Sequence, residues 1–301
     1  MSRIAATYKS RELEGVVDLL FYRNVGFWLA HFFERLEFTP TTVTLIGGVF
    51  GVVAGHFYFY RSLLLNLVGW VLHVVANIFD NADGQLARLT NQQSRTGRIL
   101  DPVVDHIVWL SIYVHLALRL RLEGFSGAIW ILAIAAGISH GAQAAAADYW
   151  RHAYLFFAKR RGEIDSTPKI KEEYCRKSWR VDAWQKVLFA LHLNVTREQE
   201  FLLPGIRRLH ENVAGLAADR VPARFQSQYA ATVRPTFKWW GLLMTNSRML
   251  ILLVLFLIHQ PVWFFWAEIG IGNLLLLLLI VQQQRISQSL VELLTAHGEC
   301  A

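Results

Sequence analysis

This chain contains very little cysteine, and that scarcity excludes two common architectures. Cys175 and Cys300 are the only cysteines among 301 residues, and their spacing fits neither a disulfide framework nor a thiolate metal site. The first dozen residues, MSRIAATYKSRE, lead into no short apolar core with a small-residue cleavage site, so we predict no removable signal peptide. The sequence shows no zinc finger or aromatic stacking motif, and we expect no nucleic-acid partner.

Charged residues are also scarce, at 18% of the chain, whereas 54% of the residues are hydrophobic, including 11 Trp and 19 Phe. This balance is too apolar for a soluble domain of this length and indicates an integral membrane protein. Crossing a bilayer takes roughly 20 apolar residues in a helix. The sequence therefore predicts an all-α bundle of six transmembrane helices, at residues 39–60, 62–89, 98–118, 125–157, 237–260 and 261–284.

The basic residues are distributed unevenly among the connections between these spans, which predicts the orientation of the protein. They gather before the first span, in the turn that holds Arg88, Arg95 and Arg98, and between residues 151 and 238, while the alternate connections hold few. By the positive-inside rule, both termini, this turn and the long insertion are cytosolic. The net charge of +7 then belongs to the cytosolic face of a multi-pass protein, most simply in the cytoplasmic (inner) membrane, where basic side chains favour anionic lipids.

Two segments are expected outside the bundle. Residues 12–37 mix apolar and charged side chains at near-helical spacing, which fits a helix in the membrane interface and equally an amphipathic helix packed on the bundle. Helices are also expected at 170–193 and after Thr196, which fits a capping box with Gln199. We divide the chain into an interfacial helix (1–38), four spans (39–158), a cytosolic basic insertion without a catalytic role (159–235), and two spans with a C-terminal tail (236–301).

The clearest exception to the apolar character is a run of charged residues in the second and third spans. An ionised carboxylate in hydrocarbon costs about 2.5 to 3.5 kcal/mol even on the most lenient scale, so such groups must face a polar cavity, a metal or one another. The spacing is D-x2-D-G-x2-A-R-x8-G-x3-D-x3-D, and the positions are filled by Asp80, Asp83, Gly84, Ala87, Arg88, Gly97, Asp101 and Asp105.

Helical periodicity brings these residues together. Spacings of three and four place the first five on one helix face, and Asp101 and Asp105 are four residues apart on the next helix. Pro102 fits the first turn of that second helix. Two helices joined by a short turn would thus aim four carboxylates at each other. Carboxylates without Cys or His favour hard ions, Mg²⁺ first and Mn²⁺ or Ca²⁺ after it, and four are enough for two ions.

Two such ions suit the chemistry of a pyrophosphate, because they neutralise its oxygens while a hydroxyl attacks one phosphorus in line. Arg88 can offer paired donors to a phosphate, and Gly84 and Ala87 leave room for a base or backbone to approach. Asp105, the last aspartate, is the natural acceptor of the proton from the attacking hydroxyl.

At these residues the chain resembles the CDP-alcohol phosphotransferase family, also called CDP-alcohol phosphatidyltransferases, which are integral membrane enzymes of phospholipid synthesis. The resemblance implies a six-helix bundle, usually a homodimer, in which Asp80, Asp83 and Asp101 bind metal. Asp105 would be a further ligand and the general base. Gly84, Ala87 and Arg88 would hold the CDP moiety, and Gly97 would be a close-packing or nucleotide-side position.

A second family motif precedes the first span and often reads P-N-x-x-T. This chain keeps Pro40 and Thr44 but has Thr41 where Asn is usual. By the resemblance, Thr44 is expected on the nucleotide side of the site.

The motif does not decide between the two halves of the family. One half moves a phosphatidyl group from CDP-diacylglycerol to a small alcohol such as glycerol phosphate, inositol or serine, and we favour it because compact members commonly use that donor. The other half moves phosphocholine or phosphoethanolamine from the CDP form to diacylglycerol. A prenyltransferase would be expected to have a second aspartate motif, which the sequence lacks. A transporter that uses buried aspartates for cations or protons is the non-enzymatic alternative, although no inverted repeat is evident.

Three further patterns carry weaker predictions. The glycines at 47, 51 and 55 form a small-residue face for close helix packing. Arg248 and Glu268 lie in the last two spans at positions that allow an ion pair, with a role in binding an anionic acceptor as the alternative. The side chains of His140, Gln143 and Asp148 line one side of the fourth span, either in an acceptor pocket or as polar groups satisfied within the bundle.

Overall fold

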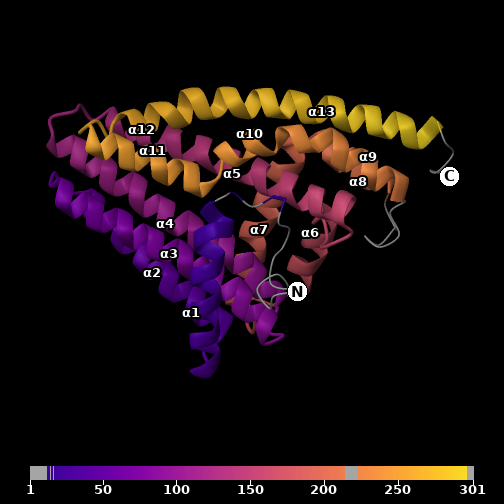
Figure 1. Cartoon of the computed structure of the whole chain (residues 1–301), viewed down its shortest axis with the longest axis horizontal. Coiled ribbons are helices and arrows are strands. Elements are labelled where there is room, and N and C mark those ends of the chain that lie inside the picture. Colours follow the sequence, from indigo (N-terminus) through magenta and orange to yellow (C-terminus); the bar gives the residue numbers. More distant parts are fainter. Residues whose placement is uncertain (1–11, 14, 16, 214–222, 297–301) are drawn as a thin grey trace. The chain divides into compact units, whose positions relative to one another are not determined.

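The computed structural model describes residues 12–13, 15, 17–213 and 223–296, and within these ranges the chain forms helices and no strand (Figure 1). The predicted all-α membrane architecture is confirmed by the helices that are long and apolar enough to cross a bilayer. In the described ranges there are six: Pro40–Tyr58, Leu63–Leu89, Arg95–Leu122, Ile129–Lys159, Arg224–Leu257 and Trp263–Glu292.

The chain divides into two compact units, of which the first comprises Met1–Gly137 and Met249–Trp266. Two of its helices continue into the second unit, namely α5 (Ile129–Lys159) and α11 (Thr245–Leu257). The elements wholly within the first unit are the π-helix η2 (Asp18–Tyr22), α1 (Arg23–Arg35), α2 (Pro40–Tyr58), α3 (Leu63–Leu89), α4 (Arg95–Leu122) and α12 (Trp263–Trp266).

Helix α2 packs against both α3 and α4, and its glycines allow the close approach. A Cβ added to Gly47 would lie 2.7 Å from the Phe79 Cβ of α3. One added to Gly55 would lie 3.0 Å from the backbone nitrogen of Ile112 in α4. The predicted small-residue packing face is therefore confirmed, and it fixes α3 and α4, which hold the motif, to a common neighbour.

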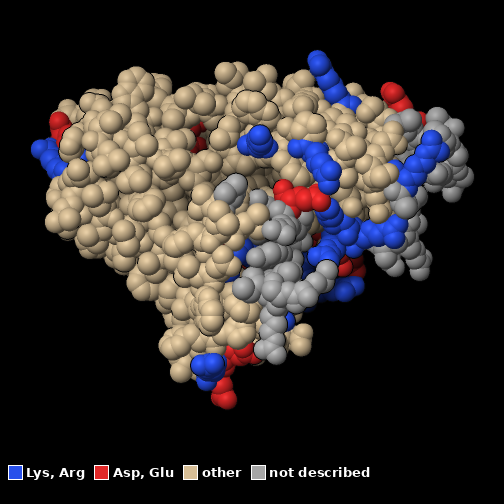
Figure 2. Space-filling model, viewed as in Figure 1, with Lys and Arg blue, Asp and Glu red and all other residues tan. Residues whose placement is uncertain are grey.

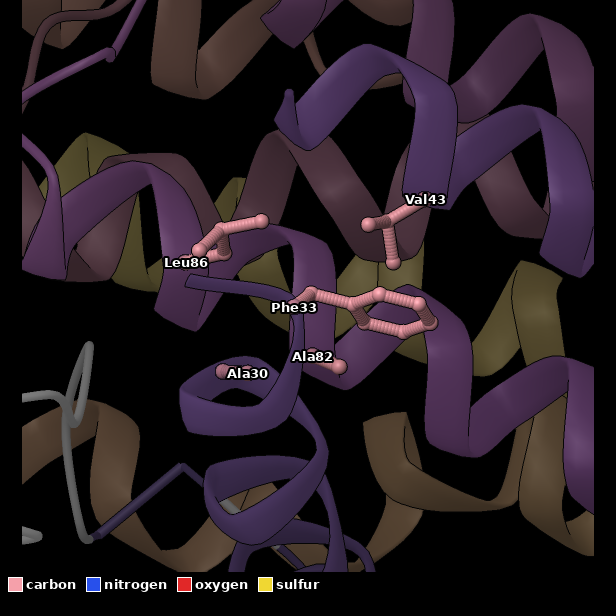
Figure 3. Packing of buried hydrophobic residues seen from close by; sticks show 5 residues of the cluster. All are labelled: Ala30, Phe33, Val43, Ala82 and Leu86. Atoms are coloured by element: carbon pink, nitrogen blue, oxygen red, sulfur yellow. The ribbon is translucent and has the colours of Figure 1, made fainter. Parts of the chain in front are cut away.

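Helix α1 packs on α3 and runs across the direction of α2, α3 and α4 (Figure 1). Its buried face packs Ala30 and Phe33 into one cluster with Val43 of α2 and with Ala82 and Leu86 of α3 (Figure 3). This cluster lies beside Asp83, so burial of apolar surface anchors the helix next to the motif. The N-terminal segment is thus an amphipathic helix packed on the bundle.

The other side of α1 leaves large apolar side chains uncovered. Trp28 is 74% exposed and Phe32 is 54% exposed. An exposed aromatic face is also the pattern of a helix at a membrane surface, so packing and an interfacial position are compatible here.

The second unit comprises Ile138–Arg248 and Ala267–Ala301. Helix α6 packs on α7, and α8 packs on α13. The elements wholly within this unit are α6 (Thr167–Arg176), α7 (Ala183–Leu202), α8 (Pro204–Asn212), α9 (Ala223–Val233), the 3-10 helix η4 (Arg234–Thr236), α10 (Phe237–Leu242), the π-helix η5 (Ala267–Gly272) and α13 (Asn273–Ala296).

One local prediction in this unit is wrong. Thr196 does not start a helix, because it is buried in the middle of α7, where its hydroxyl donates to the His192 carbonyl at 2.9 Å. The helical stretch that holds the predicted fifth span reaches back to Arg224, and within it α10 begins at Phe237 as the span was predicted to. Pro235 falls in the 3-10 turn of η4 and cannot donate a backbone hydrogen bond, which explains why the stretch is broken into shorter helices.

The surface agrees with a membrane environment. On the face shown in Figure 2, broad areas hold no Lys, Arg, Asp or Glu. Contiguous uncharged surface of this extent is unusual for a soluble protein and ordinary for helices that contact lipid.

Candidate active site on α3 and α4

The first half of the motif lies on the last turns of α3, where the predicted shared face is present. Asp83 is buried, with 3% of its surface exposed, while Asp80 one turn earlier is exposed. The Arg88 side chain runs back along the helix, since a Cβ added to Gly84 would lie 3.6 Å from Arg88 Nη1. Gly84, Ala87 and Arg88 are each partly exposed. The helix thus offers one buried and one accessible carboxylate beside a guanidinium.

Asp83 is the best-defined group of the site. Its Oδ2 accepts a hydrogen bond of 2.5 Å from the Thr44 hydroxyl of α2. The carboxylate also interacts electrostatically with Asp80 on its own helix and with Asp101 on α4. Like charges repel strongly where water is excluded, so this arrangement favours a bound cation or proton. Thr44 itself is buried, in contact with the carboxylate.

A short reversal connects α3 to α4. Asn91 adopts a left-handed conformation with φ of 55°, and the Gln92 backbone N–H returns to the Ala87 carbonyl at 3.0 Å. Ser94 then caps α4, because its hydroxyl accepts the Gly97 N–H at 3.0 Å. Gly97 therefore sits in the cap, close to the turn. The tight turn brings the second half of the motif back alongside the first.

The second half of the motif lies inside α4, and this corrects the position predicted for Pro102. Because Ser94 caps the helix, α4 begins at Arg95, and Pro102 lies in its interior. Proline has no N–H to donate to the Arg98 carbonyl, so α4 lacks one backbone hydrogen bond in the turn that contains Asp101. Asp101 is partly buried and Asp105 is exposed one turn further on.

Sequence reasoning missed one residue that holds the site in place. Gln85, in a variable position of the motif, is fully buried, and its Nε2 donates to the Arg23 carbonyl of α1 at 3.2 Å. Gly26 of α1 lies beside it, since a Cβ there would meet Gln85 Nε2 at 3.0 Å. The only sequence signal for this contact was a polar residue in an apolar helix, and that signal does not indicate which residue Gln85 contacts.

The donor set fits a hard divalent cation by its chemistry. All four candidate ligands are carboxylates on two neighbouring helices, and hard ions such as Mg²⁺ prefer oxygen donors. In the described part of the chain, no three His, Cys, Asp or Glu side chains converge closely enough to hold a metal ion. Coordination would therefore require carboxylate side chains to turn toward a common point.

The second unit contains a separate polar network inside its helices. Arg248 Nε donates to Glu268 Oε1 at 2.9 Å, and both side chains are almost fully buried. Gln143 joins them, because it accepts from Arg248 Nη2 at 2.7 Å and donates to the Glu268 carbonyl at 2.9 Å. The predicted ion pair is therefore confirmed, and Gln143 is a satisfied polar group of the bundle.

Asp148 lies outside this network and makes polar contacts of its own in the same unit. It accepts from Gln199 Nε2 at 3.3 Å and lies 3.3 Å from His152 Nδ1. His140 is buried, with 7% of its surface exposed.

A family model covers the residues of the motif, and several known proteins are similar to shorter stretches of the chain. Residues 37–167 match the family model described as CDP-alcohol phosphatidyltransferase. Over 57 residues, the chain is 39% identical to proteins of Mycobacterium tuberculosis and Mycobacterium bovis, each named "Putative cardiolipin synthase". That match covers 18% of this chain and 27% of each relative. A protein of Aquifex aeolicus is 34% identical over 77 residues, 26% of this chain and 38% of its own length.

These relatives match over less than two thirds of their length, so their names carry no activity over to the whole chain. The family match does cover the complete motif and the helices α2, α3 and α4 that position it. The resemblance seen in the sequence is thereby confirmed: residues 37–167 of this membrane protein, which hold the complete motif, match the CDP-alcohol phosphatidyltransferase family model.

Proposed function

We propose that this protein transfers a phosphatidyl group from CDP-diacylglycerol to the hydroxyl of a small polar alcohol and releases CMP. The observation that carries the proposal is the arrangement around Asp83. This carboxylate is buried and accepts a hydrogen bond from Thr44. It also interacts electrostatically with the like-charged Asp80 and Asp101, which belong to the same compact unit. Carboxylates gathered in a membrane protein favour a bound divalent cation, and such ions also bind the pyrophosphate of a CDP-linked donor.

In the proposed reaction, the acceptor oxygen attacks the phosphorus that bears diacylglycerol. A new phosphorus–oxygen bond forms, and the bond between that phosphorus and the CMP oxygen breaks with its electron pair on CMP. Asp105 takes the proton of the attacking hydroxyl. Its exposed position on α4 suits a base that must reach a substrate.

We assign the metal ligands to Asp80, Asp83, Asp101 and Asp105, with two Mg²⁺ or Mn²⁺ ions per site. When bound, the ions supply positive charge to the pyrophosphate oxygens. The hydrogen bond from the Thr44 hydroxyl to Oδ2 fixes the orientation of the Asp83 carboxylate, and with it the position of Oδ1.

We assign the CDP moiety to the face formed by Gly84, Ala87 and Arg88, with Gly97 and Thr44 at its edges. The guanidinium beside Gly84 offers several donors in one plane, which suits paired hydrogen bonds to a phosphate. The absence of a side chain on Gly84 leaves room for a flat base.

The acceptor is the least determined part of the reaction. Glycerol phosphate, inositol, inositol phosphate and serine are the small alcohols we propose first. The name of the mycobacterial relatives favours a second candidate, the hydroxyl of phosphatidylglycerol, because its phosphatidylation yields cardiolipin. Transfer of phosphocholine or phosphoethanolamine to diacylglycerol is the alternative with the same motif.

We also propose that the protein is a homodimer in the cytoplasmic membrane, with the motif turn and both termini on the cytosolic side. The support is the family match and the concentration of Lys and Arg in alternate connections. Labelling of single cysteines in right-side-out and inside-out vesicles tests the orientation, and cross-linking in native membranes tests the dimer.

The test of the proposed function is CMP release by the purified protein with Mg²⁺. CDP-diacylglycerol is paired with each alcohol and with phosphatidylglycerol, and CDP-choline and CDP-ethanolamine are paired with diacylglycerol. We expect release with CDP-diacylglycerol and one acceptor, and none after chelation. The proposal is wrong if folded protein supplied with Mg²⁺ releases CMP from none of these pairs, and that result favours the transporter. The proposed metal dependence is wrong if CMP release survives complete chelation.

A further inference from the structure

The insertion between the fourth and fifth spans carries an apolar patch that the proposed transfer reaction does not use. Three patch residues lie on one face of α7, at spacings of three and four residues, and two lie in the turn before it. Their exposed fractions range from 44% to 84%. We call this set the 179–191 patch; it consists of Trp179, Val181, Trp184, Val187 and Leu191.

The patch has clear limits on the helix. After Leu191, the same side of the helix continues with Asn194, the partly buried Val195 and Glu198. Phe189 and Leu193, on the other side of α7, are buried, and so is Leu188 at the edge of the patch. Helix α7 therefore has one side that packs in the core and, in its first turns, a second apolar side that is exposed.

Specific contacts hold the turn that carries Trp179 in place. The Lys186 ammonium lies 4.8 Å from the Tyr174 ring centroid and 5.4 Å from that of Trp179, and it donates to the Lys177 carbonyl at 2.7 Å. Lys177 in turn donates to Gln185 Oε1 at 2.5 Å. Cation–π contacts and hydrogen bonds thus fix the turn against the start of α7, and the exposed Trp179 ring is part of this ordered turn.

The charge around the patch identifies its partner. Residues 176–191 hold four basic side chains and one acidic side chain, Asp182, and of the basic ones Arg176 is ion-paired with Glu172 just before this range. Arg180 is exposed between the two patch residues of the turn. Tryptophan is enriched at the boundary between lipid and water, and each Lys or Arg near an anionic leaflet contributes about 1 kcal/mol of attraction. Apolar side chains interleaved with positive charge fit a surface of anionic lipid.

The patch is also tethered close to a bilayer. Helix α7 belongs to the same compact unit as most of α5 and as α13, which lie in candidate membrane spans. A tethered surface faces a high effective concentration of lipid, so even a small apolar patch can stay engaged. We propose that the 179–191 patch inserts into the head-group region of the anionic leaflet and anchors the insertion on the membrane. This inference needs only the membrane fold and does not depend on the transferase reaction.

The experiment uses the full-length protein with Cys175→Ser and Cys300→Ser, reconstituted into vesicles. Val187→Cys, within the patch, carries a polarity-sensitive fluorophore, and lipids with a nitroxide near the head group serve as quenchers. Arg197→Cys is the matched control, because it is exposed on the same helix outside the patch. In vesicles containing phosphatidylglycerol, we expect several-fold stronger lipid quenching at position 187 than at position 197. In phosphatidylcholine vesicles, we expect quenching at 187 to weaken.

Three results would overturn the inference. Equal access of aqueous iodide to both positions, without lipid quenching, would place the patch in water. Protection from iodide without lipid quenching, accompanied by cross-links to a second copy or another protein, would make it a protein interface. Equal lipid quenching at 187 in neutral and anionic vesicles would contradict the claim for anionic lipid. Circular dichroism and vesicle flotation confirm that both labelled variants are folded and inserted.

Discussion

Two regions of this molecule carry charged side chains inside membrane-length helices, and they solve the same physical problem in opposite ways. In the second unit, Arg248 and Glu268 neutralise each other, and Gln143 bonds both residues. On α3 and α4, Asp83 lies near Asp80 and Asp101, which carry the same charge, and receives a hydrogen bond from the neutral Thr44. A buried charge with a bonded counter-charge supports structure, whereas like charges gathered near one another favour the binding of a cation.

The largest expected effect comes from removing the proposed base. Asp105→Asn keeps the size of the side chain and removes its ability to accept the proton. We expect CMP release to fall by about 10²- to 10⁴-fold, the usual contribution of general acid–base catalysis. Asp182→Asn, outside the motif, is the control and should keep wild-type turnover. Normal turnover by Asp105→Asn would remove this residue from the proposed mechanism.

The ion pair of the second unit should respond in stability. Arg248→Leu leaves Glu268 buried without its counter-charge, and loss of one partner of a buried pair typically destabilises by about 3 to 5 kcal/mol. We expect a lower midpoint of thermal unfolding in detergent, with the KM for the acceptor unchanged in the folded fraction. The double variant Arg248→Leu/Glu268→Gln should recover much of the loss. A raised KM with normal stability would instead indicate that Arg248 binds an anionic acceptor.

The contact between α2 and the motif should have an intermediate effect. Thr44→Val removes the donor to Asp83, and a hydrogen bond to a charged group is worth about 1.5 to 3 kcal/mol. We expect turnover to fall roughly tenfold or more, while the unfolding midpoint changes little. Thr232→Val is the matched control, because that exposed hydroxyl donates to a backbone carbonyl of its own helix. Equal effects of the two substitutions would show that the contact with Asp83 is unimportant.

The smallest expected effect tests how closely α2 and α4 approach. Gly55→Ala places a Cβ 3.0 Å from the Ile112 backbone nitrogen, and such overpacking costs about 1 to 3 kcal/mol. Gly137→Ala is the control, because no atom lies within 4 Å of its added Cβ. We expect only the first substitution to lower the unfolding midpoint. Equal unfolding midpoints would show that α2 and α4 can move apart without a loss of stability.

Periodicity and spacing predicted the parts of this molecule that depend on one helix at a time. The shared face of Asp83, Gly84 and Arg88 follows from 3.6 residues per turn, and the six spans follow from apolar length. The pairing of Arg248 with Glu268 was predictable because two opposite charges in adjacent spans have few other partners. Local chemistry was sufficient in these cases.

Features that depend on contacts between helices, or on competition between local signals, were not predictable. Pro102 suggested a helix start, but the Ser94 cap earlier in the chain places that start at Arg95. Thr196 has the spacing of a capping box, yet its burial in α7 decides its conformation. The contact between Gln85 and the Arg23 carbonyl links segments 62 residues apart, and no local pattern specifies it.

Divalent metal binding tests the contrast between the two charged regions most directly. Manganese titration of the full-length protein, followed by electron paramagnetic resonance, compares wild type with Asp101→Asn and with the Arg248→Leu/Glu268→Gln double variant. We predict saturable Mn²⁺ binding by wild type and the double variant, displaced by Mg²⁺, and loss of most of it in Asp101→Asn. Equal binding by all three proteins, or none by folded wild type, would contradict the account.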